Sequence, residues 1–264
     1  MTTDPRPRET KTDETRAGTA IQISEVSKTF GRGDTALLAL DRISLSVAPG
    51  EFVCLIGASG CGKSTLLSLA AGLDAPTSGT VDTGERRVSL MFQESALFPW
   101  LTAAKNVEMP MRASGVPRAE RRERVAELLD LVQLSSFGDK RPHELSGGMR
   151  QRVALARSLA QDADVLLMDE PFGALDAMTR DLLHEVLEGI WRRRQLSILF
   201  VTHEVREAVR LGDRVVLLSS RPGQVIGEFP VDFERPRGMD SAETVGLAIK
   251  IKDRLREEIV RHGH

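Results

Sequence analysis

The chain has 264 residues, of which 41% are hydrophobic and 28% are charged. These proportions are typical of a soluble globular protein with one large domain, or one domain with an embedded subdomain. The formal net charge is -2, so no overall positive charge favours nucleic acid or anionic lipid, and we expect no nucleic-acid partner.

The first nineteen residues, 1–19, are polar and rich in proline and threonine. They offer little apolar surface to bury, and we expect them to form a disordered tail. No stretch of the chain approaches the roughly twenty apolar residues that a membrane-spanning helix needs. If the protein works at a membrane, other chains must supply the membrane-spanning part.

Short apolar, β-prone runs follow this tail and alternate with helical stretches. Unbroken apolar strands of this kind are typical of the centre of a parallel sheet, which is buried on both faces. The pattern therefore predicts an α/β fold with a mostly parallel sheet. The expected strands lie at 52–56, 88–92, 165–168, 198–201 and 215–218.

The interval from about 94 to 162 differs from the rest, because it reads as nearly all helix. Val125, Leu128, Leu129 and Val132 fall at positions i, i+3, i+4 and i+7, on one face of an amphipathic helix. This spacing predicts a small α-helical subdomain inserted into the α/β core.

The whole α/β domain, with its insertion, is expected over residues 20–237. The remaining segment, 238–264, is expected to contain a C-terminal helix, because Ile251, Leu255 and Ile259 share one helical face. Docking of this face against the core is the simplest interpretation.

A glycine-rich loop follows the expected strand at 52–56 and matches the pattern G-x-x-x-x-G-K-[ST]. Its glycines let successive backbone N–H groups converge on phosphate oxygens, and the helix that follows adds its positive N-terminal end. Lys63 would reach the β- and γ-phosphates, and the Ser64 hydroxyl would bind Mg²⁺. A glycine-rich turn without a ligand is the alternative, but the strand before the loop favours a nucleotide site. The loop comprises Gly57, Ala58, Ser59, Gly60, Cys61, Gly62, Lys63, Ser64 and Thr65.

Two acids, Asp169 and Glu170, end the apolar strand at 165–168. The C-terminal edge of a parallel sheet is where α/β proteins bind their ligands. Asp169 would hold Mg²⁺ through water, and Glu170 would act as general base for an attacking water. Taken alone, the two acids are explained equally well as negative charges that stabilise a helix N-terminus. Together with a P-loop, they indicate nucleotide hydrolysis.

A second helix start suited to an anion lies at Ser146, Gly147 and Gly148, within the segment LSGGMRQ. A serine N-cap with flexible glycines is the ordinary structural interpretation. However, the P-loop already binds the phosphates of its own nucleotide. A head-to-tail dimer would explain the second start, because each 146–148 loop would close on the γ-phosphate held by the other copy.

The P-loop, LSGGMRQ and LLMDEP together resemble the ATP-binding-cassette (ABC) ATPases over residues 21 to about 237. The resemblance implies a RecA-like P-loop NTPase core, with ATP and Mg²⁺ as cofactors. It also implies that Lys63, Glu170 and His203 are catalytic, with His203 as the switch histidine that contacts the γ-phosphate. A lone histidine after a strand is more often structural.

Further positions follow from the same resemblance. Gln93 corresponds to the Q-loop glutamine, which contacts Mg²⁺ and senses the membrane partner. Asp176 lies in GALD, which resembles a D-loop at the dimer interface, although Gly173 stands where serine is usual. Phe30 lies where the family stacks an aromatic ring on adenine, and a core position is the alternative for it.

Three classes of P-loop protein are candidates for this chain: a kinase or similar enzyme, a soluble ABC protein, and the ATPase of a transporter. A kinase or another P-loop enzyme has no use for LSGGMRQ. A soluble ABC protein of DNA repair or translation usually has two cassettes or a long coiled-coil insertion, and Lys63 and Asp169 are too close in sequence for such an insertion. We therefore expect the ATPase of a membrane transporter.

The segment MFQESALFPWLTAAKNVEMPM and the later DEPFGALDAMTR resemble the ATPases of nitrate, sulfonate and taurine importers. The short link at 78–91 and the segment SSRPGQVIGEFPVDFERPR resemble the aliphatic-sulfonate subgroup. Aliphatic sulfonates are the expected cargo. Taurine, nitrate or another small solute is the alternative.

The same resemblance implies a set of partners and a location. The partners would be a second copy of this chain, transmembrane permease subunits and, indirectly, a periplasmic or lipid-anchored solute-binding protein. The expected location is the cytoplasmic face of the cell membrane, as a peripheral protein. Cys54 and Cys61 agree with a reducing compartment, because no cluster of cysteine or histidine surrounds either of them.

Overall fold

The computed structural model describes residues 18–173 and 175–262. Apart from Gly18 and Thr19, the tail expected at 1–19 lies outside the described residues, as does Ala174 of the D-loop-like segment. None of the described helices combines the length and the apolar character that crossing a bilayer requires.

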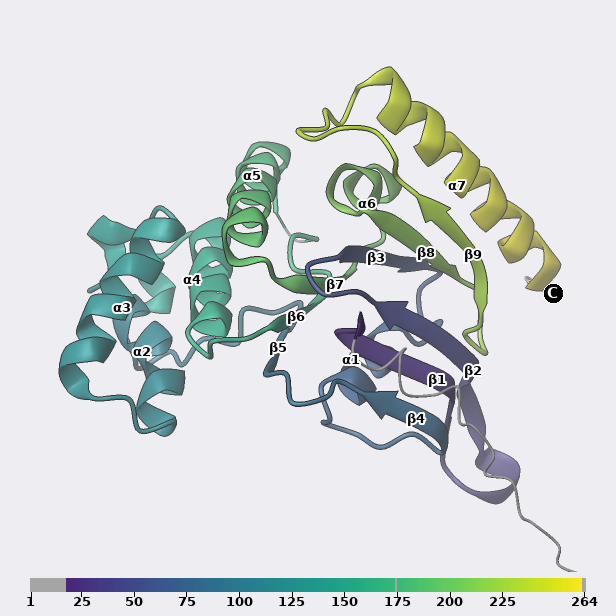
Figure 1. Cartoon of the computed structure of the whole chain (residues 1–264), viewed down its shortest axis with the longest axis horizontal. Helices are drawn as coiled ribbons and strands as arrows, with labels where there is room; N and C mark the ends of the chain where they lie inside the picture. Colours follow the sequence, from purple (N-terminus) through teal and green to yellow (C-terminus); the bar gives the residue numbers. More distant parts are fainter. Residues whose placement is uncertain (1–17, 174, 263–264) are drawn as a thin grey trace, which may run out of the picture.

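A six-stranded sheet forms the centre of the molecule, in the order β5-β6-β7-β3-β8-β9 (Figure 1). Its neighbours from β5 to β8 pair in parallel, and β9 is antiparallel to β8. Both β3 and β7 are buried along their whole length, as unbroken apolar strands predict. The α/β fold with a mostly parallel sheet is thus confirmed. The strands are β3 (Phe52–Gly57), β5 (Val88–Met91), β6 (Val165–Asp169), β7 (Ser197–Val201), β8 (Arg214–Leu218) and β9 (Val225–Pro230).

A second, antiparallel sheet has the strand order β2-β1-β4 and lies below the main sheet in Figure 1. Helix α1 (Lys63–Ala70) contacts strands of both sheets. The apolar stretches discussed above did not predict this sheet, because its strands are only partly buried and several register shifts interrupt their pairing. Its strands are β1 (Ile21–Phe30), β2 (Leu37–Val47) and β4 (Ser78–Asp82), with the short 3-10 helix η2 (Gly33–Thr35) between β1 and β2.

A helical lobe projects to the left of the main sheet in Figure 1. Val125, Leu128, Leu129 and Val132 are buried in it, in agreement with the amphipathic spacing. The helices occupy less of the interval 94–162 than expected, because loops precede α2 and connect α3 to α4. The lobe contains α2 (Ala103–Ala113), α3 (Arg118–Leu131), η3 (Ser135–Phe137), η4 (Pro142–Glu144) and α4 (Gly147–Leu159).

Three further helices pack above the main sheet: α5 (Ala177–Arg194), α6 (Val205–Leu211) and α7 (Ala242–His262). Helix α7 packs against α6. Ile251 on α7 is fully buried and Leu255 is partly buried against the core, whereas the side chain of Ile259 lies outside the described part.

A buried arginine, Arg237, secures the segment that leads from β9 to α7. Its guanidinium donates hydrogen bonds to the backbone carbonyls of Phe233, Val209, Gly212 and Val231. Burial lowers its pKa to about 10. A planar group with five donors is suited to gathering several carbonyls from separate segments.

Replacing Arg237 by leucine should destabilise the fold, because the change leaves several backbone carbonyls without a donor. We expect Arg237→Leu to lower the free energy of unfolding by about 2–4 kcal/mol in a chemical denaturation measurement. Arg256→Leu is the matched control, since Arg256 on α7 is highly exposed, and it should change the value by less than about 0.5 kcal/mol. Equal unfolding curves for the two variants would contradict this role.

Candidate active site

The P-loop connects the end of β3 to the start of α1 and depends on two glycines in left-handed conformations. Gly60 has φ +75° and Gly62 has φ +101°, and Gly62 directly precedes α1. A Cβ atom on Gly62 would lie 2.5 Å from Leu40 Cδ2, so the loop is held close against β2. Because Gly62 packs against Leu40, the P-loop lies directly beside β2.

Lys63 begins α1, yet only 7% of its surface is exposed. Its Nζ donates hydrogen bonds to the carbonyl oxygens of Gly57 at 2.8 Å and Ala58 at 3.1 Å. The ammonium is thus held within the curl of the loop. Cys61, within the loop, is also buried, and burial raises the pKa of its thiol.

A cavity of about 420 Å³ opens beside this loop. Phe30 lines the edge of the cavity and is 43% exposed, so its ring presents a free surface for stacking. The structure brings residues from six separate segments to this one cavity. Its lining consists of Phe30, Leu37, Ala39, Ser59, Gly60, Gly62, Lys63, Ser64, Thr65, Gln93, Glu170 and Arg221.

Asp169 ends β6 and accepts a hydrogen bond from the Ser64 side chain. Burial raises the pKa of Asp169, and the Glu170 carboxylate adds to the rise, whereas the Ser64 hydrogen bond and the Lys63 charge oppose it. The Asp169 carboxylate and the Ser64 hydroxyl therefore lie side by side, near the positive charge of Lys63.

Those oxygen atoms fit a magnesium ion, which usually takes one or two protein carboxylates and completes its shell with phosphates and water. Gln93, which lines the same cavity, offers an amide oxygen as well. In the described part of the chain, no group of three or more His, Cys, Asp or Glu side chains could hold a metal ion by itself. A metal in this cavity would therefore depend on the nucleotide for part of its coordination.

Glu170 follows Asp169 with a φ of +43°, which is uncommon for a residue with a side chain. Its backbone N–H donates to the Val201 carbonyl at the end of β7, a bond that holds this turn in place. The Glu170 carboxylate lies 2.9 Å from Nδ1 of His203. The turn thus brings the expected general base and the expected switch histidine together at the edge of the sheet.

The loop at Ser146, Gly147 and Gly148 does not line the P-loop cavity of its own chain. The Ser146 hydroxyl accepts a hydrogen bond from the Met149 N–H and caps α4. A Cβ atom on Gly148 would come within 2.2 Å of the Thr179 methyl group, so this helix start is packed tightly against α5.

Asp176 also lies away from that cavity, where it caps α5. Its carboxylate accepts hydrogen bonds from the Thr179 N–H at 3.0 Å and the Thr179 hydroxyl at 2.7 Å. Thr179 therefore contacts both Asp176 and Gly148, so the two segments expected at a dimer interface are joined within one chain.

Comparison with known proteins assigns this arrangement to a family. The family model described as ABC transporter matches residues 40–173, about half of the chain. The nitrate import ATP-binding protein NrtD of Synechocystis sp. is 48% identical over 228 residues, which cover 82% of this chain and 86% of that protein. The chain belongs to the ABC transporter ATP-binding proteins.

Other relatives of this ABC protein agree with that assignment. The taurine import ATP-binding protein TauB of Burkholderia pseudomallei (strain 1710b) is 46% identical over 218 residues, covering 80% of this chain and 84% of that protein. The dimeric structure of MJ0796, a bacterial ABC transporter cassette, has a TM-score of 0.72 at 33% identity and covers 81% of this chain and 100% of that one. A dimer of MJ0796 in a post-hydrolysis state, bound to ADP and Pi, has a TM-score of 0.71.

The chain is therefore an ABC importer ATP-binding subunit of the nitrate/taurine type, with an ATPase domain that binds ATP. The particular closeness to aliphatic-sulfonate proteins stays a prediction.

Helix α4 of this ABC subunit holds residues 93–97, the segment named here the Q-loop after its glutamine, through two side chains that the sequence analysis did not identify. Gln151 Nε2 donates to the carbonyl of Gln93 at 2.7 Å. Arg157 donates to the carbonyls of Ala96 at 2.7 Å and Ser95 at 2.8 Å. Since Ser146 caps the same helix, the Q-loop and the Ser146 loop are attached to one rigid element.

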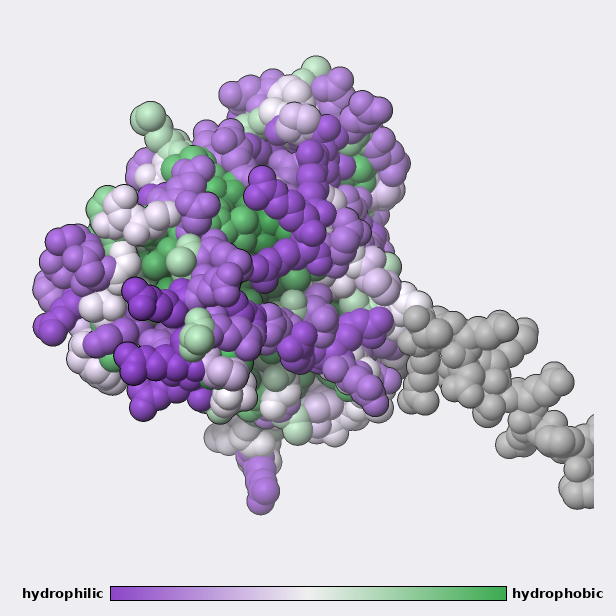
Figure 2. Space-filling view, turned by 60° about the vertical axis from the view of Figure 1, so that its left-hand side comes forward, coloured by the Kyte–Doolittle hydropathy of each residue, from purple (hydrophilic) through white to green (hydrophobic). Residues whose placement is uncertain are grey.

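A groove of about 660 Å³ lies where the Q-loop meets the helical lobe. Figure 2, which brings the lobe side of the molecule forward, shows a hollow with hydrophobic surface between hydrophilic ridges. The groove lies on a different set of residues from the P-loop cavity, and Gln93 belongs to both. It is lined by Gln93, Glu94, Ser95, Ala96, Leu97, Pro142, Gly147, Arg150, Gln151 and Leu175.

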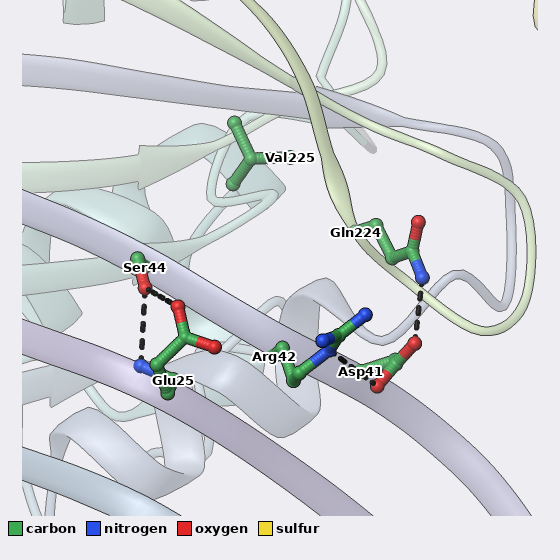
Figure 3. Close-up of a pocket in the computed structure, with 6 residues that line it drawn as sticks. All are labelled: Glu25, Asp41, Arg42, Ser44, Gln224 and Val225. Carbon is green, nitrogen blue, oxygen red and sulfur yellow. Dashed lines mark hydrogen bonds and ion pairs between the residues drawn. The ribbon is translucent and has the colours of Figure 1, made fainter.

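A third hollow, of about 380 Å³, lies beside β2 and β9 (Figure 3). Ser44 donates to Glu25 at 2.9 Å, and Gln224 donates to Asp41 at 2.6 Å. Arg42 lies 3.8 Å from the same Asp41 carboxylate. Because these polar groups contact one another, the hollow offers a phosphate much less than the P-loop cavity does.

The contact between α4 and the Q-loop can be tested through backbone protection. Replacing Arg157 by methionine keeps much of the side-chain volume but removes the donors to Ser95 and Ala96. We expect amide hydrogen exchange at 94–97 to become about tenfold faster in Arg157→Met, because the loop loses its attachment. Arg152→Met is the control on the same helix, since Arg152 donates to carbonyls at 132–133 instead. Unchanged exchange at 94–97 in Arg157→Met would rule out this attachment.

Proposed function

We propose that this protein is the ATP-hydrolysing, energy-coupling subunit of an importer for aliphatic sulfonates. The observation that carries the hydrolytic part is the convergence of Lys63, Ser64 and Glu170 on one cavity, with His203 bonded to Glu170 beside it. A cation that would bind phosphate, a hydroxyl that would help to hold a metal ion and a carboxylate that would act as general base therefore line one cavity.

In the proposed reaction, water attacks the γ-phosphate in line with the departing ADP. Glu170 accepts a proton from the water, and His203 holds the Glu170 carboxylate in position and contacts the γ-phosphate. Lys63 stabilises charge on the β- and γ-phosphates. Mg²⁺, bound through Ser64, Gln93 and Asp169, would neutralise charge on the same oxygens. Positioning and charge stabilisation therefore supply most of the rate increase.

Adenine would stack on the exposed face of Phe30, with the P-loop backbone N–H groups directed at the phosphates. The P-loop residues assigned to the phosphates are 57–65, and Leu37 and Ala39 complete the apolar wall near Phe30. The ammonium of Lys28 lies 5.1 Å from the centre of the Phe30 ring and supports that ring from its own chain.

Two copies would bind two ATP molecules between them. The support is that Ser146, Gly147, Gly148 and Asp176 belong to the site by resemblance yet lie away from the cavity of their own chain. The dimeric MJ0796 cassettes have the same fold. In our proposal, each 146–148 loop closes on the γ-phosphate held by the other copy, and the D-loop-like segment crosses the interface.

The groove between the Q-loop and the helical lobe is the proposed docking site for permease subunits. Gln93 lines both the groove and the nucleotide cavity, so its position reports the nucleotide state to the groove. Exposed aromatic side chains, Phe92 and Trp100, lie close in sequence to this loop. This docking would place the protein at the cytoplasmic face of the membrane as a peripheral subunit, served indirectly by a solute-binding protein.

The cargo is proposed from sequence resemblance to importer ATPases. The segments that carry this resemblance either take part in ATP binding or form part of the domain's framework. The support consists of the short connection from β4 to β5, the segment that spans the β8–β9 turn, and the relatives named for taurine import, since taurine is itself a sulfonate. Nitrate is the main alternative, because a relative with slightly higher identity, 48% against 46%, is named for nitrate import.

Replacing Glu170 by glutamine tests both the general base and the dimer. We expect Glu170→Gln to bind MgATP, to lower turnover at least about a hundredfold, and to accumulate as a dimer in light scattering, because closure no longer leads to hydrolysis. Glu123→Gln, an exposed change on α3, should hydrolyse ATP and dissociate as the wild type does. A Glu170→Gln protein that stays monomeric with MgATP would count against the proposal.

The cargo is tested by growth and uptake of a strain that lacks this chain, supplied with an alkanesulfonate, taurine or sulfate as sole sulfur source. We expect loss of growth and uptake on alkanesulfonates alone, with rescue by the wild-type chain but not by Glu170→Gln. Loss on taurine alone would select the taurine alternative. Normal growth on every sulfonate would overturn the sulfonate assignment and leave the ATPase unaffected, and nitrate uptake would then be measured.

A further inference from the structure

The turn between β8 and β9 brings an arginine, Arg221, into the lining of the P-loop cavity. We propose that Arg221 is a nucleotide-binding residue, which positions the P-loop from outside and adds a second cation to the cavity beside Lys63. The proposal rests on ATP binding in this cavity and assigns a role to a residue outside the P-loop, the Q-loop and the LSGGMRQ segment.

The turn that carries Arg221 is firmly held. Ser219 is buried, and its hydroxyl donates to the Pro222 carbonyl at 2.8 Å and accepts from the Gln224 N–H at 2.8 Å. Gln224 in turn donates from its amide to Asp41 on β2, as Figure 3 shows. A side chain on such a turn starts from a defined position, so little ordering is needed when a ligand binds.

The same turn is hydrogen-bonded to β2 and packed closely against the P-loop at Gly223. Its N–H donates to the Ala39 carbonyl at 2.9 Å, and its carbonyl accepts from the Asp41 N–H at 2.9 Å. A Cβ atom on Gly223 would lie 2.2 Å from the Cys61 carbonyl oxygen, so any other residue would push the turn away from the P-loop. This close approach puts Arg221 within reach of Gly60.

Arg221 donates from Nε at 3.2 Å and from Nη2 at 3.1 Å to a single acceptor, the carbonyl oxygen of Gly60. Gly60 has a left-handed φ, and two donors on its carbonyl oppose rotation of its peptide group. Since the P-loop binds phosphate through N–H groups, a fixed carbonyl direction also fixes the direction of the N–H that follows.

The guanidinium of Arg221 also brings a charge that its neighbours leave uncompensated. Within residues 18–173 and 175–262, no carboxylate lies within 4.0 Å of it, and the side chain is exposed. The cavity also holds the acid Glu170, with Asp169 adjoining it, so Lys63 alone does not give it a strong positive potential. An arginine stays charged at any physiological pH and attracts phosphate, so Arg221 favours the more highly charged nucleotide.

Equilibrium binding of ATP and ADP to the purified full chain, at low and high salt, tests this role. We expect Arg221→Gln, which keeps a donor for Gly60 but removes the charge, to bind ATP about three- to tenfold more weakly, and ADP less so. Its affinity should also depend less on salt, and Arg221→Lys should recover ATP binding to within about twofold. Arg42→Gln is the control, because it removes the same charge from the hollow in Figure 3 and should bind as the wild type does.

Wild-type affinity and salt dependence in Arg221→Gln would overturn the proposal. An Arg221→Lys protein that binds as weakly as Arg221→Gln would overturn the role of the charge. Thermal unfolding of each variant shows whether it has folded. Lys63→Ala separates this inference from the proposed function: if the wild type binds ATP and Lys63→Ala does not, the P-loop site stands whatever Arg221 does.

Discussion

The close approach of the P-loop to β2 is the constraint on which the rest of this structure depends. The chain curls tightly at this loop because Gly60 and Gly62 take left-handed conformations, and such a curl lets successive N–H groups point to one place. The contact between Gly62 and Leu40 leaves no room for a side chain, so the antiparallel sheet must lie against the loop. The P-loop cavity is therefore formed between the two sheets and does not belong to either of them.

Helix α4 joins two segments of this ATPase, the loop at 146–148 and the Q-loop. Its first residue follows the Ser146 cap, and its polar side chains Gln151 and Arg157 hold three carbonyls of the Q-loop. A helix moves as a unit, so a displacement at either end is transmitted to the other. Hydrogen bonds from side chains to backbone carbonyls suit this task, because they do not depend on the identity of the loop residues they hold.

Sequence reasoning predicted the five parallel strands of the main sheet and the helical lobe, because unbroken apolar strands and an amphipathic helix are strong signals. It missed the antiparallel strand β9, which is only partly buried. It did not predict the antiparallel sheet, whose bulged, half-exposed strands resemble irregular polar segments. It also did not single out Arg157, although a charged residue among the apolar residues of VALARSLA was a usable signal. Arg221 had no such signal, since an exposed arginine after a strand is common.

The sequence by itself determined the chemistry: a P-loop lysine and serine, a strand that ends in two carboxylates, and a second glycine-rich helix start. Local order was sufficient for these, because each depends on a backbone conformation encoded within about ten residues. Only the tertiary structure decided which side chains meet. The bond from His203 to Glu170, the attachment of the Q-loop to α4 and the position of Arg221 beside Gly60 join residues 33 to 161 positions apart. Such contacts arise from the packing of whole sheets and helices, which no local pattern records.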